Sequence, residues 1–225
     1  YSYERINMKW PTMCVDNFFD NVDEIIQAST KLKFYVDKDG RWPGKRTNNL
    51  QIENSSLASF INLKILRLVV PHFTNQLMYG ASSGFQKIDD SYGKEGWIHQ
   101  DNDTELSAII YLSDSKNCGT SIFKPKSYKS FFKHNDLKRH YLKSKQFDQK
   151  YYESLQENNS QFDETIYFES VKNRLLLFDG NQVHGVKNLI DPNNKTRLTY
   201  VAFFKFIMDP SLKGFVVESK RQLLG

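Results

Sequence analysis

The chain has 225 residues, enough for one substantial hydrophobic core, and we expect a single domain over 1–225. It contains no apolar run of about 18 residues, so no transmembrane helix is predicted, and its first residues lack the profile of a signal peptide. The net charge of +5 is concentrated in 124–150, where nine lysines and arginines accompany two acids, which excludes a uniformly basic protein. The two cysteines, Cys14 and Cys118, form no CxxC pair, so we expect a reducing, cytoplasmic environment and no cysteine zinc site.

The first third of the chain predicts helices. Residues 15–33 read as the end of a strand followed by an amphipathic helix, because apolar residues recur there at helical spacing. A second helical pattern is started by Ser55 or Ser56 and ends near Pro71. We therefore expect residues 15–75 to form a helical support for the rest of the domain.

A polar, turn-rich segment, DGRWPGKRTNNL at 39–50, separates these two helices. Its glycine and proline content predicts a loop. Since its Arg, Trp and Lys lie outside any predicted strand, the loop is either a plain connection or a wall of the substrate site.

After Gly84 the sequence breaks into short pieces rich in Ile, Val, Tyr, Phe and Thr, separated by turn residues. Many short strands without intervening helices favour an antiparallel sandwich or jelly roll. Residues 125–164 interrupt this series with a basic segment of helical composition, in which Leu137, Tyr141 and Leu142 can share one face.

The basic insertion at 125–164 has two interpretations. It is a solvated helical excursion, or it is a lid or surface for an anionic substrate. Its aromatic residues would suit stacking on bases, but no known nucleic-acid module accompanies them, so a nucleic-acid partner is not favoured. These aromatic residues are Tyr128, Phe131, Phe132 and Tyr141.

The motif GWIHQDND at 96–103 precedes the apolar run LSAIIYLS. Side chains at i and i+2 of a strand point to the same face, so His99 and Asp101 would converge on one point, as two ligands of one metal must. The alternative is a polar turn that caps a strand. Asp103 is expected to be solvated, because Asp101 already supplies a carboxylate.

A third ligand candidate, His184, lies on a late short strand in NRLLLFDGNQVHGV. Two imidazoles and one carboxylate can occupy one face of an octahedron and leave positions open, as in non-haem Fe(II) oxygenases. Further along, Arg197 and Thr199 form another i, i+2 pair on the final long strand. A guanidinium there could hold a carboxylate through two parallel hydrogen bonds, and the hydroxyl could add a third.

In this order of motifs the sequence resembles the 2-oxoglutarate- and Fe(II)-dependent oxygenases, and it is similar to prolyl-hydroxylase-like members from bacteria and phages. The resemblance covers about 84–205. It implies an α+β fold built on a double-stranded β-helix, of the jelly-roll or cupin-like kind, with N-terminal buttressing helices and a helical insertion. It also implies roles for seven residues: His99, Asp101 and His184 as iron ligands, Arg197 and Thr199 as the clamp for 2-oxoglutarate, and Gln86 or Tyr92 as an additional contact to that cosubstrate.

The implied function is a dioxygenase that uses Fe(II), 2-oxoglutarate and O2 to hydroxylate a small-molecule or peptide substrate, with release of succinate and CO2. Two alternatives stay open: a cupin-like module that binds a metal or ligand without turnover, and a zinc-dependent hydrolase, since zinc also accepts two histidines and a carboxylate. The Arg197-x-Thr199 pair speaks against the hydrolase, which needs no dicarboxylate clamp. No membrane partner is expected, and the substrate and oligomeric state lie beyond the sequence.

Overall fold

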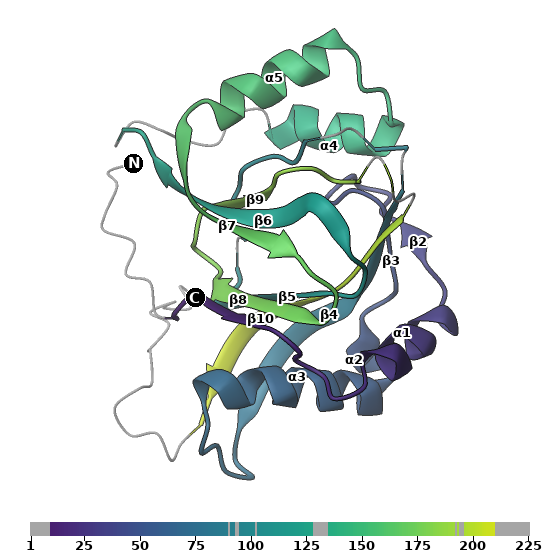
Figure 1. Cartoon of the computed structure of the whole chain (residues 1–225), viewed down its shortest axis with the longest axis vertical. Helices are drawn as coiled ribbons and strands as arrows, with labels where there is room; N and C mark the ends of the chain where they lie inside the picture. The colour runs from purple at the N-terminus through teal and green to yellow at the C-terminus, as the bar shows by residue number, and fades with distance from the viewer. Residues whose placement is uncertain are drawn as a thin grey trace, which may run out of the picture.

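Two antiparallel β-sheets face one another in the computed structural model, which describes residues 10–89, 91–92, 95–101, 103–127, 135–191, 193 and 196–209 (Figure 1). In that part of the chain the larger sheet has seven strands in the order β1-β8-β5-β10-β4-β3-β2, and the smaller has three in the order β7-β6-β9. The elements are β1 (Met13–Val15), α1 (Val22–Thr30), β2 (Tyr35–Val36), β3 (Lys45–Arg46), α2 (Leu50–Glu53), α3 (Ser55–Val69), β4 (Met78–Asp89), β5 (Leu106–Tyr111), β6 (Ser115–Pro125), α4 (Asn135–Ser144), α5 (Gln149–Asn159), β7 (Phe162–Ser170), β8 (Arg174–Asp179), β9 (His184–Val186) and β10 (Thr196–Met208).

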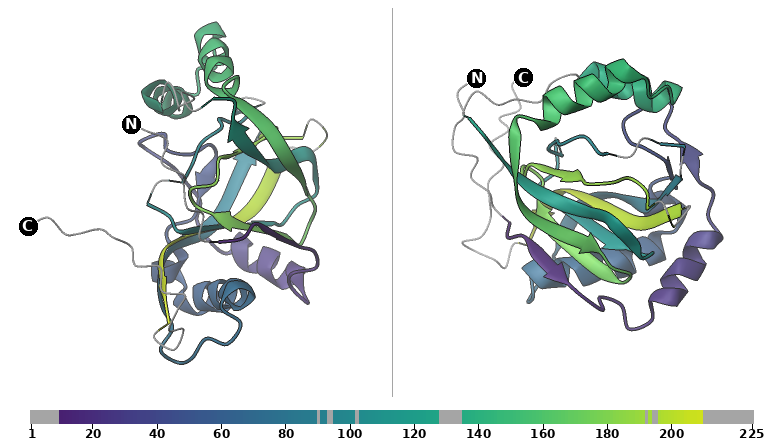
Figure 2. Two further views of the ribbon diagram at one scale, coloured as in Figure 1. Left: turned by 90° about the vertical axis from the view of Figure 1, so that its left-hand side faces the viewer. Right: turned by 45° about the horizontal axis from the view of Figure 1, so that its top comes forward.

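The helices lie on the two outer sides of the paired sheets. Helices α1, α2 and α3 cover the outer face of the larger sheet, and α4 and α5 lie at the opposite end of the molecule, beyond the smaller sheet (Figures 1 and 2). Two facing antiparallel sheets with helical support are the double-stranded β-helix that the sequence predicted, so the α+β fold class is confirmed. None of the described helices is long and apolar enough to cross a membrane.

Strand β10 contributes side chains both to the hydrophobic core and to the space between the sheets. It is buried along most of its length, and successive side chains of a strand point to opposite faces. One set packs against α3 in the main hydrophobic core, and the other set lines the space between the two sheets. The core set is Leu198, Tyr200, Ala202 and Phe204, and the set that lines the space is Arg197, Thr199, Val201, Phe203 and Lys205.

Three local predictions are corrected by the structure. Strand β4 begins at Met78, whereas the strands were predicted to begin after Gly84. The sequence did not reveal the first half of β4 because its small residues show no apolar alternation, although β10 pairs with them. The predicted loop at 39–50 contains β3, which is only two residues long and forms by pairing with β4. Helix α3 is capped by Asn54, whose side chain accepts from the Leu57 N–H, rather than by a serine.

The predicted helical insertion is present as α4 and α5 between β6 and β7. The insertion is slightly shorter than the predicted 125–164, because β6 extends to Pro125 and β7 begins at Phe162. Tyr141 and the partly buried Leu137 pack in a cluster with Tyr151 of α5, whereas Leu142 is buried in a second cluster with Ile88 and Tyr92, so the predicted apolar face is divided between two clusters. Tyr128, Phe131, Phe132 and His134 lie outside the described residues.

Candidate metal centre

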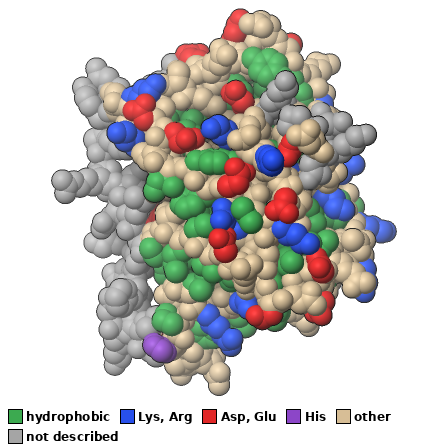
Figure 3. Space-filling view, in the orientation of Figure 1, with side chains coloured by type: hydrophobic (Ala, Val, Ile, Leu, Met, Phe, Trp, Pro, Cys, Tyr) green, Lys and Arg blue, Asp and Glu red, His purple; other side chains and the backbone are tan. Residues whose placement is uncertain are grey.

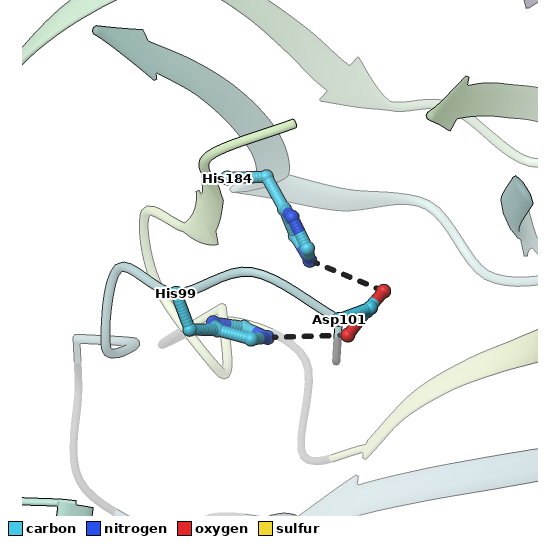
Figure 4. Close-up of side chains that lie close together, drawn as sticks. All are labelled: His99, Asp101 and His184. Atoms are coloured by element: carbon cyan, nitrogen blue, oxygen red, sulfur yellow. Dashed lines mark ion pairs between the residues drawn. The ribbon is translucent and has the colours of Figure 1, made fainter. Parts of the chain in front are cut away.

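His99, Asp101 and His184 converge on one point at the wall of the space between the sheets (Figure 4). The Nε2 atom of His99 lies 3.8 Å from Asp101 Oδ1, and the Nε2 atom of His184 lies 3.6 Å from Asp101 Oδ2. The three potential ligand atoms lie within 4.8 Å of one another. An ion placed among them would therefore have one face occupied by two imidazoles and a carboxylate.

Backbone hydrogen bonds fix the segments that carry these three side chains. His99 and His184 form an antiparallel β-bridge, and the Asp101 N–H donates to the Gly180 carbonyl at 3.0 Å. Gly180 permits this close approach, since a Cβ atom there would lie 2.0 Å from the Thr104 carbonyl oxygen. The turn at Gly180 thus holds the carboxylate segment against the strand that leads to His184.

Both imidazoles are oriented by a hydrogen bond from their other ring nitrogen. The Nδ1 atom of His99 lies 2.8 Å from the Trp97 carbonyl oxygen, and that of His184 lies 2.8 Å from the Gln182 carbonyl oxygen. Because a carbonyl can only accept, each Nδ1 must donate, which leaves each Nε2 with a free lone pair directed at the cluster. This is the tautomer that a metal-binding histidine needs.

Neighbouring groups orient the carboxylate and keep one imidazole neutral. The Ser107 hydroxyl donates to Asp101 Oδ2 at 2.6 Å and orients the carboxyl group. Desolvation, the nearby Lys138 ammonium and His184 together hold the pKa of His99 well below its usual value. His99 is therefore neutral, and a neutral imidazole is the form that coordinates a metal.

A cavity of about 520 Å³ opens beside the three ligand candidates. This is within the usual size range of small-molecule sites. Its walls come from β4, β5 and β10 of the larger sheet, from β9 of the smaller sheet, from α4, and from the 41–46 segment. The structure therefore joins the candidate metal ligands and the candidate clamp residues in one space.

Arg197 lines this cavity and has only 3% of its surface exposed. Its Nε atom has no hydrogen-bond partner in the described part of the chain, and its guanidinium lies 5.7 Å from the centre of the Tyr111 ring. Burial lowers the pKa of Arg197, and within the described residues no carboxylate forms an ion pair with it. A buried cation without a counter-charge among the described residues is costly, so an anion bound in the cavity would stabilise it.

Thr199 is also buried in the cavity wall, two residues after Arg197 on the same face of β10. Gln86 of β4 is the register partner of Thr199. Gln86 donates from Nε2 to the Pro43 carbonyl at 2.7 Å. Tyr92 is placed differently. Its ring packs with Ile88 in a small apolar cluster, and its hydroxyl points at a backbone carbonyl of the 41–46 segment. Of these two alternatives, Gln86 is the one among the cavity-lining residues.

Trp42, Arg46 and Lys138 also line the cavity, although the sequence suggested only their segments, the 39–50 loop and the basic insertion, as possible walls. Arg46 donates from Nη2 to Gln86 Oε1 at 3.2 Å, while its Nε is buried without a partner among the described residues. Burial lowers the pKa of Arg46 to about 10 and that of Lys138 to about 8. The 41–46 segment is thus a cavity wall, and α4 contributes Lys138 to the site instead of being solvated on all sides.

Four further residues lie outside the candidate ligand set. Asp103 is exposed and adopts φ 60°, a turn conformation beside the site. Arg174 pairs with Asp16 at the edge of the larger sheet. Trp97 lines the cavity, as a pocket wall would, and His140 is exposed on α4.

Comparison with protein families gives one match over most of the chain. Residues 1–204 match the model of a family described as "Family of unknown function (DUF6445)". The chain belongs to this family. No protein with a curated description matches the sequence.

Solved structures with the same fold include proteins that bind 2-oxoglutarate or depend on α-ketoglutarate. EvdO2 from Micromonospora carbonacea var. aurantiaca is 13% identical, with a TM-score of 0.56 over 89% of each chain. HygX from Streptomyces hygroscopicus, solved with nickel and 2-oxoglutarate, is 12% identical, with a TM-score of 0.52 over 87% of this chain and 83% of its own. The α-ketoglutarate-dependent epimerase SnoN from nogalamycin biosynthesis is 13% identical, with a TM-score of 0.53 over 89% and 78%. At these identities the likeness establishes the fold, and the narrower resemblance to prolyl-hydroxylase-like members stays a prediction.

Proposed function

We propose that the protein is a 2-oxoglutarate- and Fe(II)-dependent oxygenase that hydroxylates a small-molecule or peptide substrate. The observation that carries this proposal is the position of Arg197, a buried guanidinium without a carboxylate partner among the described residues, in the same cavity as His99, Asp101 and His184. A metal site alone requires no such cation. A metal site together with a dicarboxylate cosubstrate does.

The roles of the protein residues follow from their chemistry. His99 and His184 offer their Nε2 atoms, because Nδ1 of each is bonded to a backbone carbonyl, and Asp101 offers a carboxyl oxygen that Ser107 orients. Three ligands on one face leave open positions for cosubstrate and dioxygen on an octahedral ion. Arg197 would bind the far carboxylate of 2-oxoglutarate through two parallel hydrogen bonds, with the Thr199 hydroxyl as a further donor.

The reaction balances without any further reductant. When bound, Fe(II) supplies the redox chemistry by which 2-oxoglutarate, O2 and a substrate C–H group become succinate, CO2 and a C–OH group. The protein holds the reactants together and restricts water in the cavity between the two sheets. The volume of about 520 Å³ suits a small molecule or one peptide residue beside the cosubstrate.

The test is an anaerobic titration of the protein with Fe(II) and 2-oxoglutarate, followed by optical spectroscopy. Chelation of the metal by 2-oxoglutarate should produce a metal-to-ligand charge-transfer band at one equivalent of each. Admission of O2 should then yield succinate in step with loss of 2-oxoglutarate. A binding module would give the band without succinate, and a zinc hydrolase would give neither, so either result contradicts the proposal.

A further inference from the structure

We propose that the cavity contains a second anion site, formed by Arg46 and Lys138, which binds a carboxylate or phosphate group of a small-molecule substrate. This inference rests on the proposed function, because it assigns Arg197 to the cosubstrate and the second site to the substrate. It names a substrate class, an oxyanion-bearing small molecule, that the metal ligands alone do not specify.

Arg46 is positioned by three contacts and still has an unused donor. Its guanidinium carbon lies 4.5 Å from the centre of the Trp42 ring and 5.4 Å from that of Phe203, and one terminal nitrogen bonds Gln86. The Nε atom is buried with no partner in the described chain, and the same holds for the indole Nε1 of Trp42. Two buried donors without acceptors beside one cavity favour an acceptor-rich ligand between them.

Arg46 pairs in register with Gln86, and Gln86 pairs with Thr199, so the backbone of Arg46 lies in the same row of the sheet as the clamp residues. Its side chain extends from that row to Phe203, toward the metal side of the cavity. Phe203 of β10, which Arg46 contacts, pairs with Ser107 of β5, and Ser107 bonds the ligand candidate Asp101. Arg197 lies at the other end of the same wall, where its guanidinium is near Tyr111, the partner of Thr199.

The two guanidinium groups have different neighbours, since that of Arg46 contacts the rings of Trp42 and Phe203 and that of Arg197 lies near Tyr111. We therefore assign them to two sites. A single dicarboxylate held at Arg197 leaves the site at Arg46 for another molecule.

The charges in the cavity give an independent argument. The described cavity lining contains a single carboxylate, Asp101, and six cationic side chains: Arg41, Arg46, Lys138, Arg139, Arg197 and Lys205. A divalent ion, Asp101 and the dianion 2-oxoglutarate together carry one negative charge, which Arg197 neutralises. Arg41 is already paired with Asp37 at 2.8 Å.

Of the four other cations, Arg139 and Lys205 are exposed to solvent, which leaves Arg46 and Lys138 as partly buried cations without an ion pair among the described residues. A guanidinium matches the paired oxygens of a carboxylate or phosphate, and an ammonium adds a mobile point charge. Lys138 belongs to α4, so the insertion that gives the sequence its basic segment supplies one of the two cations.

The test uses the full-length protein loaded with Fe(II) and 2-oxoglutarate under argon, titrated by calorimetry with three probes that share one ring: benzoate, phenyl phosphate and benzamide. We expect at least one of the two anions to bind tenfold or more tightly than the neutral amide. The tighter anion identifies carboxylate or phosphate as the recognised group. Equal affinity for all three probes, or no binding of any, would overturn the proposal.

Two variants locate the site. Arg46→Gln should weaken binding of the preferred anion at least tenfold and change binding of benzamide less than twofold. Lys138→Gln should weaken the same anion by about threefold or more, and it tests the site independently if Arg46→Gln does not fold. In Lys138→Gln the charge-transfer titration should return the wild-type affinity for 2-oxoglutarate within threefold. Arg46→Gln also removes the hydrogen bond to Gln86, so its affinity for 2-oxoglutarate is measured beside that for the probes.

The matched control is Lys45→Gln, which removes one positive charge from the same two-residue strand at an exposed position. It should leave all three affinities unchanged, and an equal loss of anion binding in it would overturn the assignment. If Arg46→Gln weakens 2-oxoglutarate and spares the probes, Arg46 belongs to the cosubstrate; the second site is then wrong and the proposed function stands. If wild-type protein binds no 2-oxoglutarate, both proposals fail.

Discussion

His99 and His184 exchange two backbone hydrogen bonds, each N–H donating to the carbonyl of the other at 2.9 Å. The bridge brings the imidazole centres to 4.4 Å although 84 residues lie between the two positions. Because backbone bonds hold both segments, the ligand geometry does not require the metal. A metal that binds only the folded state should then add stability by mass action.

This arrangement leads to a prediction about the ligands themselves. His99→Ala and Asp101→Ala should each abolish Fe(II)-dependent turnover, because each removes one of three ligands while the bridge preserves the fold. Iron binding by equilibrium dialysis should weaken by more than the roughly 10- to 100-fold that outer-sphere changes cost. Asp103→Asn is the control and should be far milder, since Asp103 is exposed. Equal damage from Asp103→Asn would mean that the wrong carboxylate was assigned.

The hydroxyl that orients the carboxylate gives a second prediction. Ser107→Ala removes the 2.6 Å hydrogen bond to Asp101 Oδ2 without changing the ligands. Partners of this kind typically contribute 10- to 100-fold to metal affinity. We expect iron affinity to fall about tenfold, with circular dichroism and thermal unfolding close to wild type. An unchanged iron affinity would show that the serine has only a packing role.

The pKa of His99 predicts how the metal-free protein responds to acid. That pKa is held well below 6.5 in the folded state, so below about pH 6.5 the unfolded chain binds a proton that the folded chain does not. Stability should therefore fall as the pH drops from about 7 to 5, and His99 should contribute no slope above pH 7. Thermal unfolding of wild type and His99→Gln across this range should show a shallower slope in the variant. Parallel slopes would exclude a contribution from His99.

The candidate residues His99, Asp101, Arg197 and Thr199 could be proposed from the sequence because their signal is local. His99 and Asp101 sit two positions apart before an apolar run, and Arg197 and Thr199 repeat that spacing on a strand. Alternation on a strand fixes which side chains share a face, so the motif already contains much of the geometry.

Arg46 and Lys138 could not be predicted in this way. Arg46 reaches the cavity because a two-residue strand pairs with β4 forty positions later in the sequence, and a strand of two residues leaves no periodic pattern. Lys138 reaches it because α4 folds back over the site, which composition alone does not reveal. The GRWPGKR stretch gave a partial signal, since its Arg and Trp residues lay outside any predicted strand.

The last prediction concerns the clamp that separates an oxygenase from a metal binder or a hydrolase. Truncating one partner of a buried charge pair typically costs about 2–5 kcal/mol, and each 1.4 kcal/mol is about tenfold in affinity. Arg197→Ala should therefore weaken 2-oxoglutarate binding about 30-fold or more in the charge-transfer titration. Arg197→Lys should recover only part of this loss, because an ammonium keeps the charge and loses the paired hydrogen bonds.

Thr199→Val, nearly the same shape, should cost about 1 kcal/mol, the contribution of one ordinary hydrogen bond. Iron affinity without cosubstrate should barely change in all three variants, since neither residue is among the candidate ligands. Wild-type affinity for 2-oxoglutarate in Arg197→Ala would contradict the proposed function. Loss of iron binding with retained binding of 2-oxoglutarate would also contradict it, because Arg197 would then support the metal site and would not bind the cosubstrate.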